Sequence, residues 1–320
     1  MARAAELIER VTAIFRQRVV GQESLHRALL SGLIANGHVL LESVPGLAKT
    51  TAAQALATAV GGSFHRIQCT PDLMPNDIIG TQIFNFQTGE MTTQIGPVHA
   101  NFVLLDEINR SSAKTQSAML EAMQERQTTI GGNVYELPNP FMVMATQNPI
   151  EEEGTYVLPE AQMDRFLLKE VITYPTPEEE MQILDMSTSG VFDAPTTGAP
   201  ITTEDVLFLQ ATRRRIFVHD AIRAYIVDII NTTRGYGPHP VPGLMQQLRV
   251  GASPRGSLAL LQVAQTQALI AGRNYVIPDD IVSMRYSVLR HRLIRSYEAI
   301  ANELSVNQVI DSIFGAVPVP

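Results

Sequence analysis

The segment around residue 46 carries the residue types that bind phosphate groups. A lysine and two threonines follow a Pro-Gly turn in the run Ser43-Val44-Pro45-Gly46-Leu47-Ala48-Lys49-Thr50-Thr51. An apolar run at 38–42 precedes this loop and a helix-like run at 49–60 follows it, which is the context that a phosphate-binding loop requires. Successive backbone N–H groups can converge on phosphate oxygens, and the helix N-terminus adds partial positive charge. We expect Lys49 to reach the β- and γ-phosphates of a nucleotide and the Thr50 hydroxyl to bind Mg²⁺.

The loop departs from the usual pattern G-x-x-x-x-G-K-[ST] at both glycine positions. Ser43 occupies the first position and Ala48 the last. Both residues are small, so the backbone can still approach phosphate, although each adds a Cβ atom. Gly46 supplies one permissive position within the loop. The alternative interpretation is an ordinary Pro-Gly turn that caps a helix.

A second apolar run ends in two adjacent carboxylates. Residues 102–105 are Phe-Val-Leu-Leu, and Asp106 and Glu107 follow them directly. Burying charge is costly, so a buried strand that ends in two acids indicates a use for them. In a phosphate-loop ATPase, Asp106 would hold the Mg²⁺ shell and Glu107 would polarise the attacking water. The alternative is a strand that ends in a solvated acidic turn.

A third strand-like run, 141–146, is followed by Gln147, Asn148 and Pro149. A neutral amide next to a γ-phosphate can orient water without adding charge, so Asn148 is our candidate for that sensor. The alternative is an Asn-Pro turn at the end of a strand.

Together these motifs resemble the MoxR group of AAA+ ATPases, over a stretch from about Gly21 to about Leu293. The residues that carry the resemblance are Val20-Gly21-Gln22, Val44-Pro45-Gly46-Leu47-Ala48-Lys49-Thr50, Leu105-Asp106-Glu107-Ile108-Asn109-Arg110, Ala145-Thr146-Gln147-Asn148-Pro149, Leu158-Pro159-Glu160-Ala161-Gln162-Met163-Asp164-Arg165-Phe166 and Gly251-Ala252-Ser253-Pro254-Arg255. Ala48 is normal for this group, whereas Ser43 stands where the group usually has glycine. The resemblance implies ATP and Mg²⁺ as cofactors, bound by Gly21, Gln22 and residues 44–51.

Two arginines are further candidates for contact with the nucleotide. The resemblance implies that Arg165 is an arginine finger donated to the ATP of a neighbouring subunit, and the alternative is a surface salt bridge. Arg255 follows Ser253-Pro254 at the expected start of a helix, where a positive charge is unfavourable. We therefore interpret Arg255 as an anion-binding second sensor carried by the lid domain.

The order of the elements predicts an α/β fold. Helical patterns alternate with strand-like segments at 38–42, 64–69, 102–106, 141–146 and 167–172. This alternation predicts a parallel sheet with helices on both faces, and ligands bind at the carboxyl ends of its strands. The resemblance implies an AAA+ P-loop core with strand order 5-1-4-3-2.

The core is expected to span 1–174 and a C-terminal all-α lid domain 175–320, with Pro175 and Pro177 marking the linker. We expect a loop at 188–200 and lid helices at 203–214, 219–234, 255–271, 279–293 and 305–314. Residues 71–101, with two strands around a Thr-Gly turn, correspond by resemblance to the helix-2 insertion of the MoxR clade. Residues 127–138 predict a second hairpin, placed before the sensor strand.

Composition excludes some classes of function. The chain has 320 residues, a net charge of −8 and one cysteine, Cys69. The acidic balance argues against a nucleic-acid partner, and one cysteine excludes an internal disulfide and fits a cytoplasmic location. Cys69 reads as a small buried residue. No apolar run approaches the length of a membrane span.

These observations predict an ATP-hydrolysing AAA+ protein that acts on other proteins. We expect a homo-oligomer in the form of a hexameric ring, with chaperone-like remodelling or assembly of client proteins, or insertion of a metal or cofactor. By resemblance, a partner could be a protein with a von Willebrand factor A domain. Two alternatives are a DNA-directed AAA+ motor and a nucleotide-binding scaffold without turnover.

Overall fold

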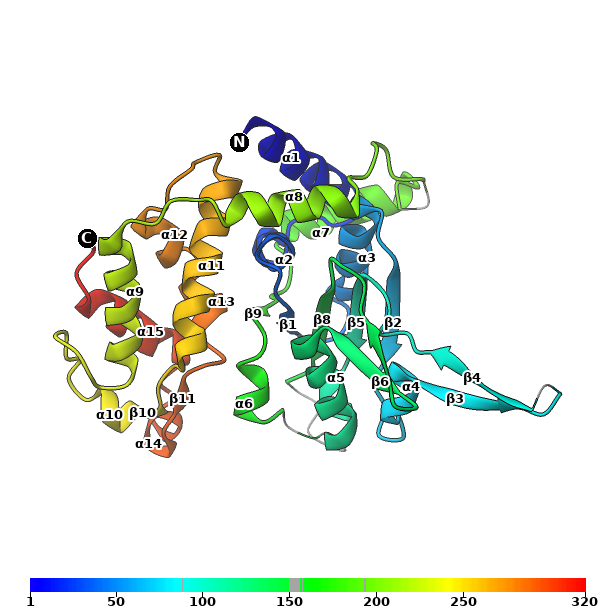
Figure 1. Ribbon diagram of the computed structural model, residues 1–320. Coiled ribbons are helices and arrows are strands. Elements are labelled where there is room, and N and C mark those ends of the chain that lie inside the picture. The colour runs from blue at the N-terminus through cyan, green and yellow to red at the C-terminus, as the bar shows by residue number, and fades with distance from the viewer. Residues whose placement is uncertain (88, 150–155, 157, 193) are drawn as a thin grey trace. The chain divides into compact units, whose positions relative to one another are not determined.

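The computed structural model describes residues 1–87, 89–149, 156, 158–192 and 194–320 (Figure 1). Packing divides the chain into two compact units. The first, here called the sheet unit, comprises Leu7–Pro159 and Glu170–Leu207. The second, the helical unit, comprises Met1–Glu6, Glu160–Lys169 and Phe208–Pro320. The predicted domains 1–174 and 175–320 divide the chain at another point, and we keep them as a proposal.

Five strands form the central sheet, in the order β2-β5-β8-β1-β9. They are β1 (Val39–Glu42), β2 (Phe64–Gln68), β5 (Phe102–Asp106), β8 (Met142–Gln147) and β9 (Leu168–Val171). Numbered along the chain, this order is the predicted 5-1-4-3-2, which is confirmed. The strand pairs β1–β8, β5–β8 and β2–β5 are parallel. Every residue of β5 is buried, which explains its unbroken apolar run before Asp106.

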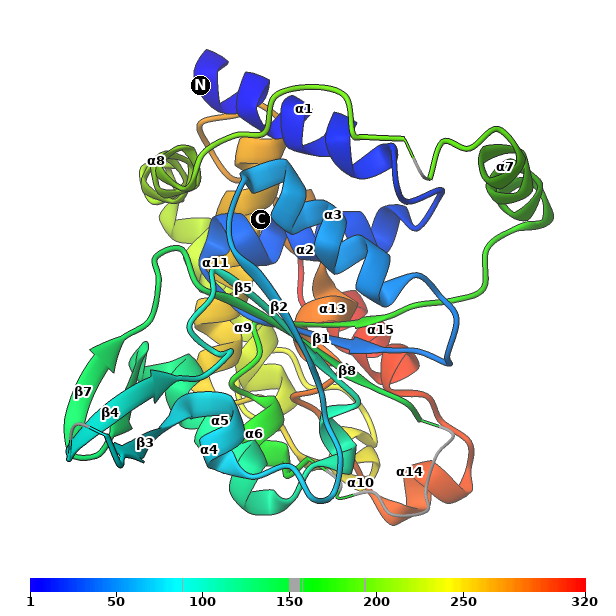
Figure 2. The same ribbon diagram turned by 90° about the vertical axis from the view of Figure 1, so that its right-hand side faces the viewer.

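Helices cover both faces of the sheet. The connection through α3 (Lys49–Val60) and the one through α5 (Ala113–Glu125) cross the sheet in opposite directions. Because parallel crossovers are right-handed, these helices must lie on opposite faces, as Figure 2 shows. The helix α2 (Glu23–Ala35) packs against α3. Other helical elements before residue 190 are α1 (Ala2–Arg16), η1 (Ile108–Arg110), α6 (Glu160–Met163), which belongs to the helical unit, and α7 (Pro177–Thr188).

Two antiparallel hairpins extend from the sheet unit (Figure 1). A short helix α4 (Pro75–Ile79) leads into β3 (Gly80–Asn85) and β4 (Glu90–Ile95). The second hairpin joins β6 (Gln127–Ile130) to β7 (Asn133–Glu136) through two glycines with positive φ. Thr88, part of the predicted Thr-Gly turn, lies outside the described residues. The assignment of the first hairpin to the MoxR insertion stays a prediction.

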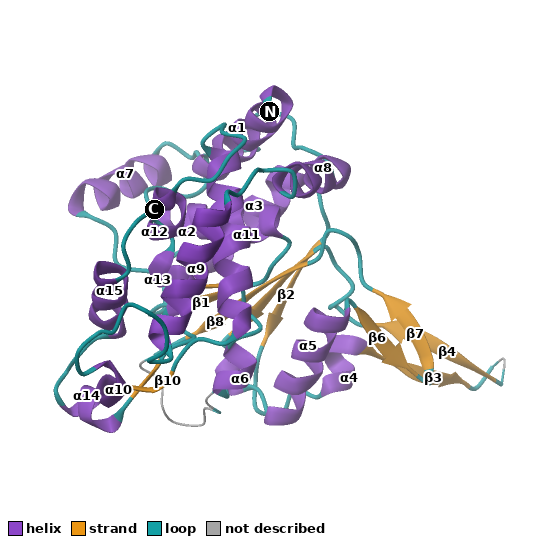
Figure 3. Cartoon of the chain, turned by 60° about the vertical axis from the view of Figure 1, so that its left-hand side comes forward, coloured by secondary structure: helices purple, strands orange, loops and turns teal. Residues whose placement is uncertain are grey.

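Helices make up most of the helical unit (Figure 3). The C-terminal elements are α8 (Thr203–Arg213), α9 (Asp220–Thr233), α10 (Leu244–Gln247), β10 (Leu248–Val250), α11 (Pro254–Ile270), α12 (Pro278–Val282), α13 (Arg285–Leu289), β11 (Ile294–Arg295), α14 (Tyr297–Ala301) and α15 (Val306–Ala316). The predicted single helix at 279–293 is wrong, because the chain leaves the helical conformation at the buried Met284 (φ −114°, ψ 8°). The small β10–β11 pair was not predicted. No helix among the described residues is long and apolar enough to cross a membrane.

Candidate nucleotide-binding site

The predicted phosphate loop connects β1 to α3, as its sequence requires. Gly46 has φ +85°, and Ala48, at the N-cap of α3, has φ +53°. This left-handed conformation costs a residue with a Cβ atom about 1–2 kcal/mol, which explains why the common pattern has glycine at the position of Ala48. Ser43 is buried, and its hydroxyl donates to the carbonyl of Val44 at 2.8 Å. The extra side chain at Ser43 is therefore satisfied within the loop.

Asp106 lies at the carboxyl end of β5 with both oxygens occupied. Oδ1 accepts a hydrogen bond from the hydroxyl of Thr146 at 2.7 Å. Oδ2 accepts from Nη2 of Arg66 at 2.6 Å and from its Nε at 3.2 Å. The side chain of Asp106 is 12% exposed and that of Arg66 is 49% exposed. The carboxylate is thus fixed from inside by a buried hydroxyl and capped from outside by a solvated guanidinium.

Glu107 is held by its backbone and by its carboxylate. Its backbone is left-handed (φ 58°, ψ 52°), a conformation that is uncommon outside glycine and that clusters at functional sites. Its N–H donates to Oγ1 of Thr146 at 2.8 Å. Oε2 accepts from Nε2 of Gln68 at 3.0 Å and from Nη1 of Arg110 at 3.1 Å. One threonine, Thr146, therefore orients both acids of the motif.

The strand order places the segment of Asn148 between the phosphate loop and the Asp106–Glu107 pair. Because β8 lies between β1 and β5, Asn148 follows a strand whose neighbours lead into the phosphate loop and into Glu107. Asn148 is buried. Next to it, Nε2 of Gln147 donates to Oε2 of Glu42 at 2.7 Å.

Cys69 is buried as predicted, and burial together with nearby Asp106 raises the pKa of its thiol to about 12.

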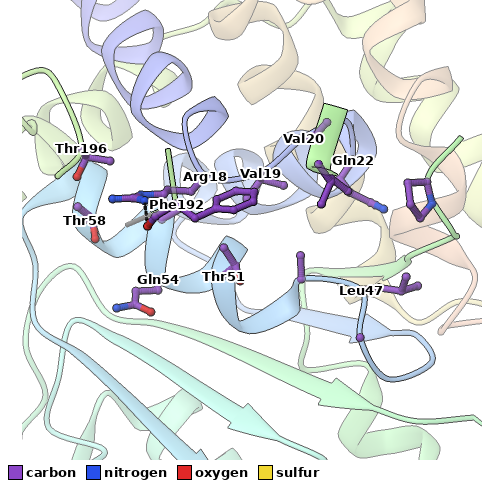
Figure 4. Close-up of a pocket in the computed structure, with 15 residues that line it drawn as sticks. Arg18, Val19, Val20, Gln22, Leu47, Thr51, Gln54, Thr58, Phe192 and Thr196 are labelled. Atoms are coloured by element: carbon purple, nitrogen blue, oxygen red, sulfur yellow. Dashed lines mark hydrogen bonds between the residues drawn. The ribbon is translucent and has the colours of Figure 1, made fainter. Parts of the chain in front are cut away.

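A cavity of about 580 Å³ opens beside the phosphate loop, entirely within the sheet unit (Figure 4). Its lining includes five residues that the sequence assigned to nucleotide binding, which are Gln22, Gly46, Leu47, Ala48 and Thr51. Gly21, with φ +60°, adjoins this set. The lining also includes residues that sequence reasoning missed: Arg18, Val19, Val20, Gln54, Ala55, Thr58, Pro175, Ile183, Phe192 and Thr196. A nucleotide with its phosphates on the loop has room for its base in this cavity.

Mg²⁺ would be held by the hydroxyl of Thr50 and the carboxylate of Asp106. Both are hard oxygen ligands, which is the donor type that Mg²⁺ takes together with substrate phosphates. Asp106 fits this use because only its inner oxygen is bound by a buried group, Thr146. The outer oxygen is bound by Arg66, whose side chain is half exposed and therefore not locked in place by packing.

The two candidate arginines both belong to the helical unit, where Asp164 connects their segments. Oδ2 of Asp164, the neighbour of Arg165, accepts from the hydroxyl of Ser253 at 2.7 Å. Ser253 caps α11 and accepts in turn from the N–H of Arg255 at 3.1 Å. Oδ1 of Asp164 accepts from Nε of Arg292 at 2.9 Å. The carboxylate next to Arg165 is thus bound by Ser253, which joins the segments of the two arginines, and by Arg292.

Arg292 is the buried anchor of this connection. It also donates to the carbonyls of Phe166 at 2.7 Å and Leu167 at 3.1 Å. Burial lowers the pKa of Arg292 to about 10, so the side chain stays charged at neutral pH. Its charge is compensated by Asp164 and by backbone dipoles, which is the condition for burying a guanidinium.

We predict that Arg292→Ala lowers the free energy of unfolding by about 3 kcal/mol, because the substitution leaves the carboxylate of Asp164 without its buried partner. Urea unfolding followed by circular dichroism measures this loss. The matched control is Arg249→Ala, which removes a pair with Glu160 at 2.6 Å whose side chains are 52% and 46% exposed. Such an exposed pair contributes less than about 1 kcal/mol. Equal losses in the two variants would contradict the role of Arg292.

Comparison with known proteins decides the family. Residues 38–168 match the ATPase family associated with various cellular activities (AAA), and residues 245–313 match the AAA lid domain. The chain is 47% identical to Chaperone MoxR1 of Mycobacterium tuberculosis, over 100% of this chain and 84% of that protein. This chain belongs to the MoxR family of AAA+ ATPases. Protein MoxR of Methylorubrum extorquens is 31% identical to it, over 99% of this chain and 95% of that protein.

The MoxR fold is also shared with a solved structure. A crystal structure from Cytophaga hutchinsonii superposes with a TM-score of 0.93 at 41% identity, over 99% of this chain and 96% of that one. Within this fold, the described residues at the carboxyl edge of the sheet bring together the phosphate loop, Asp106, Glu107 and Asn148. Arg165 and Arg255 lie in the helical unit: Arg165 follows Asp164 in the chain, and Arg255 is linked to Asp164 by hydrogen bonds through Ser253.

Proposed function

We propose that this MoxR-family chain binds ATP with Mg²⁺ and hydrolyses it in a ring of identical subunits. The observation that carries the proposal is the shared anchor Thr146. Its hydroxyl donates to Asp106 and accepts from the N–H of Glu107, so a metal-binding acid and a water-activating acid leave one strand with fixed geometry. This pair lies at the sheet edge that also carries the phosphate loop.

Each residue has a defined task in this proposal. The N–H groups of residues 46–51 and the ammonium of Lys49 bind the phosphates, and Thr50 and Asp106 hold the metal. Bound Mg²⁺ supplies charge neutralisation at the β- and γ-phosphates. Glu107 accepts the proton of the attacking water, and Asn148 orients that water. Gln68 and Arg110 both donate to Oε2 of Glu107, so the other oxygen, Oε1, can accept the hydrogen bond from the water.

Arg165 and Arg255 would complete the site from outside the sheet unit. In the proposed ring, which we infer to be hexameric, Arg165 reaches the ATP of the neighbouring subunit and stabilises charge in the transition state. Arg255, at the start of α11, senses the phosphates of its own subunit. The hydrogen bond between Asp164 and Ser253 supports a coupling between the two contacts. If the segment of Arg165 moves, the segment of Arg255 must move with it, or this hydrogen bond must break.

The ring would act on other proteins. The name of one relative, Chaperone MoxR1, supports chaperone-like remodelling or assembly of clients, including insertion of a metal or cofactor. A protein with a von Willebrand factor A domain is the partner that we propose from the family resemblance. The exposed apolar side chains of the β3–β4 hairpin, among them Ile83, Phe84 and Phe86, are suited to contact such clients.

Lys49→Ala tests the phosphate site. We expect its Kd for ATP to rise by about tenfold to a hundredfold, because a charge-assisted contact to phosphate contributes about 1.5–3 kcal/mol. Isothermal titration calorimetry on the full chain measures the affinity. Lys114→Ala, which removes an exposed lysine of α5, should bind ATP like the unmodified protein. An unchanged Kd in Lys49→Ala would remove this loop as the phosphate site.

A further inference from the structure

The cavity beside the phosphate loop continues past the place where phosphates would bind. Its far end is lined by Thr58 of α3 and by Phe192 and Thr196 from the segment between α7 and α8. Phe192 is the only aromatic residue among the fifteen that line the cavity. In Figure 4 its ring lies beside Val19, over the surface of α3 that carries Thr51. An aromatic ring therefore faces the same cavity as the phosphate loop.

The described residues between α7 and α8 form no helix or strand, yet side chains from elsewhere in the sheet unit hold their backbone. Arg18 donates to the carbonyl of Val191 at 3.1 Å and also to those of Phe192 and Ala194. The dashed line in Figure 4 marks the bond to Phe192. Five N–H donors in a rigid, planar fork allow one arginine to hold several carbonyls at once. Arg18 thus fixes the backbone on both sides of the aromatic ring.

Two other side chains hold the rest of this segment. Nε2 of Gln17 donates to the carbonyl of Thr197 at 2.9 Å, and Oε1 of Gln17 accepts from the N–H of Thr197 at 2.7 Å. Arg10 donates to the carbonyls of Ala199 at 2.9 Å and Pro200 at 3.0 Å. All three anchors come from α1 or the turn after it, directly before Val19 and Val20 of the cavity wall. The wall opposite α3 is therefore preorganised.

The chemistry of the cavity changes along its length. The loop end offers backbone N–H groups at a helix N-terminus, which suit phosphates. Beyond the loop, the lining combines the apolar side chains of Val19, Ile183 and Phe192 with the amide of Gln54. A purine base has two π-faces that pack on aromatic and aliphatic groups and an edge that hydrogen-bonds to amides. The loop therefore suits the phosphates of a nucleotide, and the lining beyond it suits the base.

We propose that Phe192 contacts the purine base of the bound nucleotide, and that Arg18 is the positioning residue that holds Phe192 in place. This proposal rests on the proposed function, because it concerns the base end of the same site. It makes the segment between α7 and α8 part of the nucleotide pocket. The segment then responds to nucleotides that carry a base and not to phosphate chains alone.

A fluorescence experiment tests the contact directly. The chain contains no tryptophan, so Phe192→Trp places a single reporter in the cavity. We expect ATP and ADP to quench or shift its emission, because a stacked base changes the surroundings of the indole, and we expect inorganic tripolyphosphate to leave it unchanged. The matched control is Phe86→Trp, at a hairpin position that is 90% exposed, where none of the three ligands should change the emission.

Affinities give the second readout. Phe192→Ala should raise the Kd for ATP and for ADP by about tenfold, the loss expected for one base–aromatic contact, and leave the Kd for tripolyphosphate unchanged. Phe192→Tyr, which keeps the ring, should restore the affinity for ATP. Arg18→Ala should weaken ATP binding in the same direction, again without an effect on tripolyphosphate.

The outcomes separate this proposal from the proposed function. If the unmodified protein binds neither ATP nor tripolyphosphate, the phosphate site itself is wrong. If it binds both, but Phe192→Ala retains the affinity for ATP and Phe192→Trp gives no response to ATP, only the base contact is refuted. Equal weakening of ATP and tripolyphosphate in Phe192→Ala would also refute it, because that result indicates general disruption of the loop.

Discussion

Glu107→Gln is expected to lower kcat for ATP hydrolysis by about a thousandfold, which is within the range that a general base contributes. The amide has nearly the shape of the carboxylate, and its oxygen can still accept from Gln68 and Arg110, which bind Oε2 in the structure. It cannot take a proton from water. The Kd for ATP should therefore change little while turnover is lost.

Calorimetry for binding and a steady-state phosphate-release assay on assembled protein measure the two quantities separately. Glu125→Gln is the matched control, since Glu125 is an exposed residue at the end of α5. Turnover near the unmodified rate in Glu107→Gln would show that another group activates the water. An unmodified protein that binds ATP but releases no phosphate would instead favour the scaffold without turnover.

The predictable parts of the fold are those in which a short stretch of sequence shows both the secondary structure and the functional side chains. β5 is buried throughout, so its sequence is an apolar run, and the two acids after it mark its carboxyl end. The loop before α3 combines a turn, a lysine and a helix start in a few adjacent residues. Each of these signals lies in a short continuous stretch of sequence. The strand order could not be read from such stretches and came from the family resemblance.

Arg66 and Gln68 were missed because their importance depends on register between strands. In β2 they alternate with Ile67, so both side chains lie on one face of the sheet. The register pairs Gln68 with Asp106, which brings Arg66 and Gln68 to the two acids at the carboxyl end of β5. A shift of one residue would place them on the opposite face. The predicted strand order already placed β2 beside β5. The polar-apolar-polar alternation at 66–68 was therefore the sequence signal that could have placed Arg66 and Gln68 near the acids.

Phe192 was missed for a different reason. The composition around it is rich in Ser, Thr, Gly and Pro, which predicts a loop and says nothing about what the loop contacts. Its anchor, Arg18, lies 173 to 176 residues away along the chain from the carbonyls that it binds. No local pattern reports a contact of that separation.

Arg165→Ala is expected to leave ATP binding nearly intact and to lower the rate of hydrolysis by about a thousandfold or more, the effect of losing an arginine finger. The proposed finger stabilises charge that develops in the transition state, so its loss affects kcat rather than the ground state. Arg223→Ala, which removes an exposed arginine of α9 in the same unit, is the control for general effects on the helical unit. A wild-type rate in Arg165→Ala would exclude the finger.

Mixing two inactive proteins tests whether this arginine acts on a neighbour. An Arg165→Ala subunit keeps Glu107, and a Glu107→Gln subunit keeps Arg165, so one contact in a mixed ring can assemble a complete site. We expect partial recovery of activity that increases with protein concentration, because it requires subunits to associate. The matched control replaces the second protein by the double variant Glu107→Gln, Arg165→Ala, which brings no finger and should give no recovery. Rings that demonstrably contain both single variants and remain inactive would refute the shared site, since an arginine acting within its own subunit cannot be supplied by a neighbour.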